Sequence, residues 1–271
     1  MHIYPVSAYR NQIFSILAGL GLAVALAILC PVDLIAQNNR AELEEAMRVA
    51  DSLYNHFEEA EALRRYEAIL EESPMQYMAL WRSSYLYSRV GNRQSSEDEM
   101  RAFFNRGIQR ARQALDVDSS DVYSNFVMSV AQGRKALIAG ASERVAASRE
   151  IRHYVERALS FNDEHAGSWH VLGRWHAKMS NLSFAERMAA KYLFGGTPPA
   201  SVEEAFEALE KAVELKPDFI LYRYDLASLY EREGKDRKAI EVLKGTVNLE
   251  PKTPDDPENL KKSRALLNDL Q

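Results

Sequence analysis

Cysteine is almost absent from this sequence of 271 residues, and several kinds of chemistry are excluded with it. The one cysteine is Cys30, so the chain after it offers no disulfide framework, structural zinc cluster or catalytic thiol. A phosphate-binding loop is missing too, because no Lys-Ser/Thr pair follows Gly195-Gly196. His170 and His176 would point about 240° apart on one helix, which is wrong for a shared metal. We therefore expect no catalytic residues, no metal site and no cofactor.

A surplus of basic residues is also missing. The chain has 34 Lys and Arg residues against 39 Asp and Glu residues, which gives a net charge of −5. The balance is the same without residues 1–36, where 33 basic residues face 38 acidic ones. A protein that binds phosphate backbones needs a basic excess, so we expect no nucleic-acid partner.

One long apolar run is present near the N-terminus. Residues 13–30 are uncharged, Arg10 precedes them, and the small residue Ala36 follows. This order predicts a secretory signal peptide over residues 1–36, cleaved after Ala36. The run is also long enough to span a bilayer, so an uncleaved anchor that tethers the protein to the inner membrane is the alternative. The leader predicts an exported protein, periplasmic in a cell with two membranes.

Residues 220–253 carry the pattern of a helical hairpin with a 34-residue period. Large and small residues alternate at the positions that a tetratricopeptide (TPR) unit requires, followed by a helix stop. Positions 7, 8, 11, 20, 24 and 32 are Leu226, Ala227, Tyr230, Ala239, Leu243 and Pro251. The two alanines would let antiparallel helices approach closely, and the proline cannot continue the second helix.

The preceding unit has the same pattern but is split. Gly173 stands at position 8 and Ala205 at position 20, 32 residues later instead of 12, so about 20 residues are inserted. The insert carries helix signals of its own. Ser183 to Glu186 is a capping box, and Gly195-Gly196 suits a left-handed stop after a helix over residues 184–194. Ser201 is placed to cap the resumed second helix.

The whole chain after the leader follows this scheme. We predict an all-α fold, a right-handed superhelix of about five TPR-like hairpins in a domain over residues 37–271. Some hairpins carry insertions, and Asp256-Pro257 starts a final capping helix. The predicted units cover residues 43–76, 77–121, 122–165, 166–219 and 220–253, and the cap covers residues 256–270.

The split unit resembles the regulator of microtubule dynamics family. The resemblance rests on the run from Gly167 to Trp175, on Leu193-Phe194-Gly195-Gly196, and on Glu203-Glu204-Ala205. Members of that family have a WHxLGRW first helix followed by an inserted LFG segment before the second helix. The resemblance implies a TPR-like fold, and for eukaryotic members an association with microtubules and membranes. The leader indicates an exported bacterial member instead.

In a TPR stack the first helix of each hairpin lines the concave face, chiefly through positions 2, 5, 9 and 12. On this sequence those positions are rich in aromatic and methionine residues, which dominate interaction surfaces. The predicted peptide-binding groove consists of Met47, Tyr54, Met78, Trp81, Tyr85, Tyr123, Phe126, His170, Arg174 and Tyr224. An error of one position would place several of these rings between helices instead. We further expect Trp169 in the core and Trp175 against the inserted helix.

These features predict an exported, non-enzymatic adaptor that binds a peptide or helix of a partner protein in its groove. Arg174 would pair with an acidic group of that peptide. Two alternatives remain at this point. One is a cytoskeletal or membrane-associated structural protein, which the family resemblance implies. The other is a small-molecule carrier or enzyme that uses a pocket beneath the inserted helix.

Overall fold

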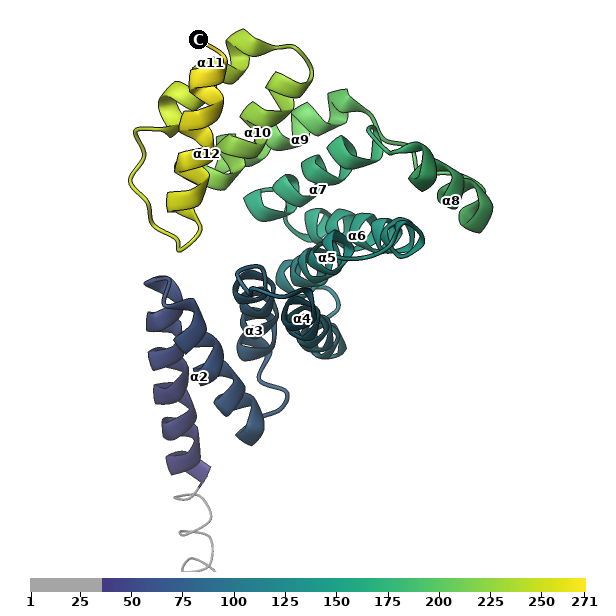
Figure 1. The fold of residues 1–271 in the computed structure, drawn as a ribbon. Coiled ribbons are helices and arrows are strands. Elements are labelled where there is room, and N and C mark those ends of the chain that lie inside the picture. The colour runs from purple at the N-terminus through teal and green to yellow at the C-terminus, as the bar shows by residue number, and fades with distance from the viewer. Residues whose placement is uncertain (1–35) are drawn as a thin grey trace, which may run out of the picture. The chain divides into compact units, whose positions relative to one another are not determined.

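A computed structural model describes residues 36–271, and every regular element in that range is a helix (Figure 1). The prediction of an all-α fold is confirmed. The predicted leader, including the apolar run at residues 13–30, lies outside the described residues except for Ala36. Contacts divide the chain into two compact units, one ending at Val49 and the other covering Ala50–Gln271. Residues 36–49 of the first unit are helical, and so are residues 50–55 at the start of the second.

The second unit is a series of helical hairpins. After α2 (Glu59–Glu72), the paired helices are α3 (Tyr77–Gly91) with α4 (Glu97–Val117), α5 (Val122–Leu137) with α6 (Ala141–Phe161), α7 (Ala166–Met179) with α9 (Val202–Leu215), and α10 (Ile220–Arg232) with α11 (Asp236–Thr246). The last helix, α12 (Asp256–Asp269), packs against both α10 and α11. Hairpins with a C-terminal helix are the architecture that the repeat pattern predicts.

Small residues allow the paired helices to approach closely. A Cβ atom on Gly173 would lie 2.7 Å from Cγ of Leu209 and 3.0 Å from its backbone nitrogen. Ala205 on the facing helix is fully buried, and so are Ala227 and Ala239 in the next hairpin. The close contact between α7 and α9 therefore requires glycine at position 173, as the repeat pattern indicates.

The inserted helix α8 (Phe184–Phe194) begins and ends as its sequence predicts. The Ser183 hydroxyl accepts a hydrogen bond from the backbone N–H of Glu186, whose carboxylate accepts one from the N–H of Ser183. At the other end, Gly195 has a φ of 73°, the left-handed conformation that glycine adopts without strain. The helix packs against α6, so the insertion is supported by the preceding hairpin.

The two tryptophans of α7 are placed by their hydrogen bonds. Trp175 contacts α6, the helix that supports the inserted one: its indole N–H donates to the backbone oxygen of Ser148 at 2.7 Å, and the Arg152 guanidinium lies 5.0 Å from its ring. Trp169 was expected in the core, and here the structure differs. Trp169 is only half-buried, because its N–H donates to the backbone oxygen of Asp163 in the loop before the helix. Hydrogen-bond partners therefore decide the placement of both rings.

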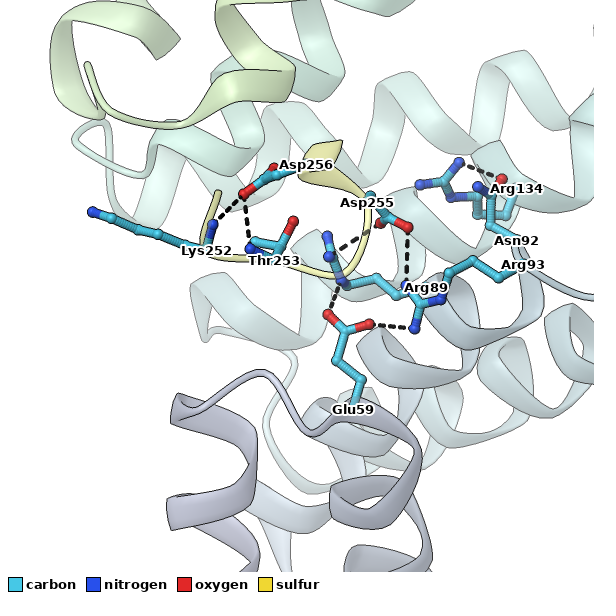
Figure 2. Close-up of polar contacts among 9 residues, drawn as sticks. All are labelled: Glu59, Arg89, Asn92, Arg93, Arg134, Lys252, Thr253, Asp255 and Asp256. Carbon is cyan, nitrogen blue, oxygen red and sulfur yellow. Dashed lines mark hydrogen bonds and ion pairs between the residues drawn. The ribbon is translucent and has the colours of Figure 1, made fainter. Parts of the chain in front are cut away.

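The pair Asp256-Pro257 predicts Asp256 as the N-cap of the last helix and Pro257 in its first turn, and the structure differs at the cap. The cap residue is Asp255, and Asp256 already lies within α12. The Asp256 carboxylate accepts hydrogen bonds from the backbone N–H groups of Lys252 and Thr253, at 2.9 Å and 2.7 Å (Figure 2). It folds the preceding loop instead of capping the helix, so the Asp255 side chain is available for contacts elsewhere.

Candidate functional site

A cavity of about 420 Å³ lies against the first helices of four successive hairpins, α3, α5, α7 and α10. Residues of α6 and of the loop and first turn of α8 complete its wall. Much of the lining is aliphatic and comes from Val130, Leu137, Val145, Val171, Met179 and Leu221. In volume and lining this cavity is typical of ligand-binding pockets in proteins.

Four of the ten groove residues chosen from the sequence line this cavity. They are Tyr85 on α3, Phe126 on α5, and His170 and Arg174 on α7. The rings of Tyr85 and Phe126 lie 5.7 Å apart and form one part of the wall. Three different hairpins therefore bring these four side chains to one place.

Three more of the predicted residues form a row of stacked rings. Trp81 lies parallel to Tyr123, with ring centres 4.4 Å apart, and its other neighbour is Tyr54 at 6.3 Å. The imidazole of His165 joins this row to the cavity wall, 5.5 Å from Tyr123 and 4.6 Å from Phe126. Trp81 is buried within the row, whereas Tyr123 remains exposed at its edge.

The other three predicted residues lie elsewhere. Met47 belongs to the first compact unit, whereas every residue of the cavity belongs to the second. Met78 is an exposed side chain on α3, and Tyr224 on α10 is half-buried. Neither Met78 nor Tyr224 is among the residues that line the cavity. The role of all ten residues in binding a peptide stays a prediction.

A polar cluster stands on α7 and α10 at the cavity. His170 is buried, and its Nε2 lies 2.7 Å from a carboxylate oxygen of Asp225. The ring of His170 stacks on Tyr222 at 4.3 Å. Burial lowers the pKa of His170, so the imidazole is neutral at pH 7 and its N–H donates to the carboxylate. Arg174 lies 3.4 Å from the same oxygen and supplies the balancing positive charge.

Arg134, on the last turn of α5, contributes a second cation to the lining. Its Nη1 donates to the side-chain oxygen of Asn92 at 2.8 Å, which is a neutral partner (Figure 2). Within residues 36–271, no carboxylate lies at ion-pair distance from this guanidinium. Burial lowers the pKa of Arg134 to about 10, and the nearby Arg174 and Arg89 add to the effect. The side chain is still charged at pH 7.

A third arginine of the lining belongs to a cluster that we call the clasp, formed by Glu59, Arg89, Arg93 and Asp255 (Figure 2). Arg89 forms ion pairs with Glu59 and, at 3.1 Å, with Asp255. Arg93 forms ion pairs with the same two carboxylates, at 2.6 Å and 3.0 Å. The clasp therefore joins the start of α2 and the end of α3 to the loop before α12.

Burial and pairing have opposite effects on Arg89. Burial alone would lower the pKa of its guanidinium. The phenol of Tyr85 and the carboxylates of Glu59 and Asp255 outweigh this effect and raise the pKa above its ordinary value. Glu59 and Arg89 are both buried, with side chains exposed by only 4% and 7%, so each charge depends on the other for compensation.

The groove pattern did not select Arg134, Tyr222 or Asp225, although all three are part of this site. Arg134 directly follows Gly133, which occupies position 12 of its hairpin and also lines the cavity. Tyr222 follows Leu221, which occupies position 2 and lines the cavity as well. In the sequence, these residues were marked only by standing next to a position of the groove pattern. Many other residues share that feature, so it could not identify them.

The described part of the chain contains no group of three His, Cys, Asp or Glu side chains that could hold a metal ion. In the same part, no helix is both long enough and apolar enough to cross a membrane.

The cavity offers aromatic walls, aliphatic lining and fixed charges. These are groups that bind and orient another molecule.

A family model described as regulator of microtubule dynamics protein 1-3 matches residues 46–271. Among curated relatives, regulator of microtubule dynamics protein 3 of Xenopus laevis is 28% identical over 181 residues, which are 66% of this chain and 39% of that protein. Regulator of microtubule dynamics protein 1 of Bos taurus is 26% identical over 212 residues, 78% of this chain and 66% of that protein. The matches thus span less than two thirds of either relative.

Among solved structures, the chain is similar to a thermophilic TPR protein of Thermus thermophilus. The TM-score is 0.60 at 18% sequence identity, and the match covers 83% of this chain and 98% of the other. At this identity the likeness concerns the fold, and it agrees with the hairpins that the repeat pattern predicts.

Proposed function

Because the chain belongs to the regulator of microtubule dynamics family and folds as a TPR-like stack, we propose that it is a non-enzymatic scaffold. In this proposal the cavity between α3, α5, α7 and α10 receives a peptide segment of a partner protein. The supporting observation is that one cavity combines aromatic rings from several hairpins with a cation that has no acidic partner among the described residues.

The charges around the cavity favour a segment with an acidic side chain. The clasp balances Arg89 and Arg93 with two carboxylates, and Asp225 balances Arg174. Arg144 and Lys178 of the lining share the carboxylate of Glu186. Arg134 is the remaining cation of the lining, and among the described residues its side-chain partner is the neutral Asn92. A peptide carboxylate that reached its guanidinium would form a charge-assisted hydrogen bond in a partly desolvated site, where such bonds are strong. The aromatic and aliphatic lining would hold the apolar neighbours of that residue.

Photo-crosslinking from two positions tests this proposal, with and without a substitution that fills the cavity. A photoreactive amino acid at Val130, inside the cavity, is used to capture the partner in the source cell. The same group at Glu207, an exposed residue of α9, is the control position. The capture is then repeated with Gly133→Phe, which fills the cavity, and with Gly133→Ala.

Gly133 suits this purpose because the nearest atom to an added Cβ is Cδ1 of Ile151, at 4.0 Å. Alanine fits there without a clash, and phenylalanine has to extend into the cavity. We expect one partner to be captured from position 130 and not from position 207, to survive Gly133→Ala, and to be lost with Gly133→Phe. Capture that persists with Gly133→Phe contradicts a peptide in the cavity.

A microtubule-directed role is a second candidate, and the names of the relatives favour it. The net charge of −5 opposes binding to an acidic polymer lattice. Co-sedimentation with polymerised tubulin distinguishes this candidate from the scaffold proposal, and we expect the protein to stay in the supernatant.

We further propose that the protein is exported, either with its leader removed after Ala36 or with residues 13–30 kept as a membrane tether. The sequence pattern of the leader supports this proposal. Mass spectrometry of the N-terminus from the source cell separates the two forms. An intact leader on a protein found in the cytoplasm would contradict export.

A further inference from the structure

The inserted helix α8 exposes four large apolar side chains. Phe184 is 72% exposed, Met188 49%, Tyr192 90% and Leu193 47%. The first three are spaced four residues apart, so they lie on one side of the helix. A surface helix normally turns such residues toward the protein. Here α8 packs against α6 and still leaves these four in contact with water.

The charges on α8 are as unusual as its apolar residues. Its one acidic residue, Glu186, is buried and lies 3.3 Å from Lys178 and 3.5 Å from Arg144. The exposed charges of the helix are Arg187 and Lys191, both positive. Residues 178–200 contain three cations and one carboxylate, whereas the whole chain has a net charge of −5. The exposed surface of α8 is therefore cationic and apolar on an acidic protein.

The helix is held in place at both ends. The capping box of Ser183 and Glu186 fixes its start, and Gly195 ends it. Beyond the end, the Arg152 guanidinium donates to the backbone oxygen of Pro199 at 2.9 Å. The exposed apolar face is thus a built feature of the fold. With 11 residues the helix is roughly 16 Å long, about half of the hydrocarbon thickness of a bilayer.

We propose that α8 is a membrane-surface element that lies in the headgroup region of an anionic lipid bilayer. Phe184, Met188 and Tyr192 would enter the boundary of the acyl chains. Arg187 and Lys191 would remain with the phosphates. Aromatic and aliphatic side chains bordered by Lys and Arg are the composition of interfacial helices. The absence of exposed acidic residues on the helix favours an anionic surface, because each cation near such a surface adds attraction.

A fluorescent label at position 192 tests the proposal on the full-length chain. Cys30 is the sole cysteine, so Cys30→Ser with Tyr192→Cys gives one attachment site for an NBD fluorophore. The matched control carries Cys30→Ser with Glu207→Cys on the exposed side of α9. Both proteins are mixed with vesicles of phosphatidylcholine alone or with added phosphatidylglycerol. The label reports on its own surroundings, so attachment through residues 13–30 does not mimic the signal.

We expect a blue shift and a several-fold rise of NBD emission at position 192 with the anionic vesicles, a smaller change with phosphatidylcholine, and none at position 207. Arg187→Glu with Lys191→Glu should weaken the response to anionic vesicles by at least about fivefold for each charge removed. Phe184→Ser with Met188→Ser should weaken it in both vesicle types. Phe184 and Met188 are exposed, so thermal unfolding should be unchanged in that double variant. Arg187 also donates a hydrogen bond to the backbone oxygen of Leu182, so the charge variant should melt lower by no more than about 4 °C.

Three results would overturn the proposal. One is an emission at position 192 that vesicles leave unchanged. Another is an equal response at positions 192 and 207, which would mean that the whole surface adsorbs. The third is a shift that grows with protein concentration in the absence of vesicles, because the exposed face would then bind a second copy of the chain rather than lipid.

Discussion

Arg89 and Arg134 line the same cavity, yet their electrostatic surroundings are opposite (Figure 2). Arg89 forms ion pairs with Glu59 and Asp255, whereas the hydrogen-bond partner of Arg134 is the neutral amide of Asn92. The pKa of Arg89 is raised above its ordinary value and that of Arg134 is lowered. Arg89 thus stabilises the fold through its ion pairs, whereas Arg134 keeps a charge that an acidic ligand could neutralise.

The difference has a thermodynamic consequence. Removing one partner of a buried ion pair leaves the other charge without compensation, which is costly. Removing a buried charge that had no counter-charge takes away a desolvation penalty instead. The two arginines should therefore respond in different ways to substitution, and the clasp offers the largest effect.

Glu59→Gln should break the clasp. The substitution leaves Arg89 buried with only Asp255 as a counter-charge, so we expect the free energy of unfolding to fall by about 3–5 kcal/mol. Chemical denaturation followed by circular dichroism measures this loss. Glu58→Gln, at the exposed neighbouring position, is the control and should change stability by less than about 0.5 kcal/mol. Equal effects of the two substitutions would show that the clasp is not needed.

A fall in pH should destabilise the protein through His165, whose ring lies against Phe126 of the cavity wall. Its Nδ1 accepts a hydrogen bond from the N–H of Ser168 and caps α7. Burial, with a smaller effect of Lys216, lowers the pKa of His165 to about 4. The unfolded chain then takes up the proton first, so stability is complete above about pH 6.5 and is lost as the pH falls towards 4.

We expect this group to account for about 1–3 kcal/mol of unfolding free energy between those two pH values. His165→Asn keeps an acceptor at the cap and does not titrate, so its stability should depend less steeply on pH. Some slope should remain, because burial also lowers the pKa of His170 and His176. Denaturant titrations of both proteins from pH 7 to pH 4 compare the slopes, and parallel curves would contradict the assignment.

The sequence predicted the hairpins because their determinants are local. Gly173 and Ala205 permit the approach of two helices, and Ser183 and Gly195 set the ends of the inserted helix. The clasp was not predicted, because its residues are distant in the sequence. Arg93 and Asp255 are 162 positions apart, and they meet only after the last hairpins have been placed. The repeat period describes neighbouring helices, so it does not show that Arg93 and Asp255 lie close together in space.

The cavity lining was predicted in part for a related reason. Positions 85, 126, 170 and 174 follow from the repeat, since a hairpin turns the same positions inward. On α10 the cavity is lined by Tyr222, and not by the chosen Tyr224. That choice depends on the rotation of the hairpin about its own axis, which packing against α9 and α12 decides. Small residues in register permit several such rotations.

A weaker substitution sharpens the comparison within the clasp. The Arg93 side chain is 30% exposed, whereas that of Arg89 is 7% exposed. Water screens the partly exposed charge, so Arg93→Gln should cost only about 1 kcal/mol. That loss should shrink in high salt, which screens exposed pairs more than buried ones. Denaturation of wild type and variant at low and high salt measures both effects, and a loss as large as that of Glu59→Gln would contradict the ranking.

The smallest expected effect on stability is the most informative one. Arg134→Gln keeps a donor for Asn92 and removes a charge that has no described carboxylate at ion-pair distance, so the unfolding free energy should change by less than about 1 kcal/mol. Arg89→Gln is the matched control and should lower the unfolding free energy by about 3 kcal/mol or more. It leaves the carboxylates of Glu59 and Asp255 with Arg93 as their one cationic partner in the clasp. If Arg134→Gln is as stable as wild type but no longer captures a partner from position 130, its charge serves binding. A large loss of stability would instead make Arg134 a second structural arginine.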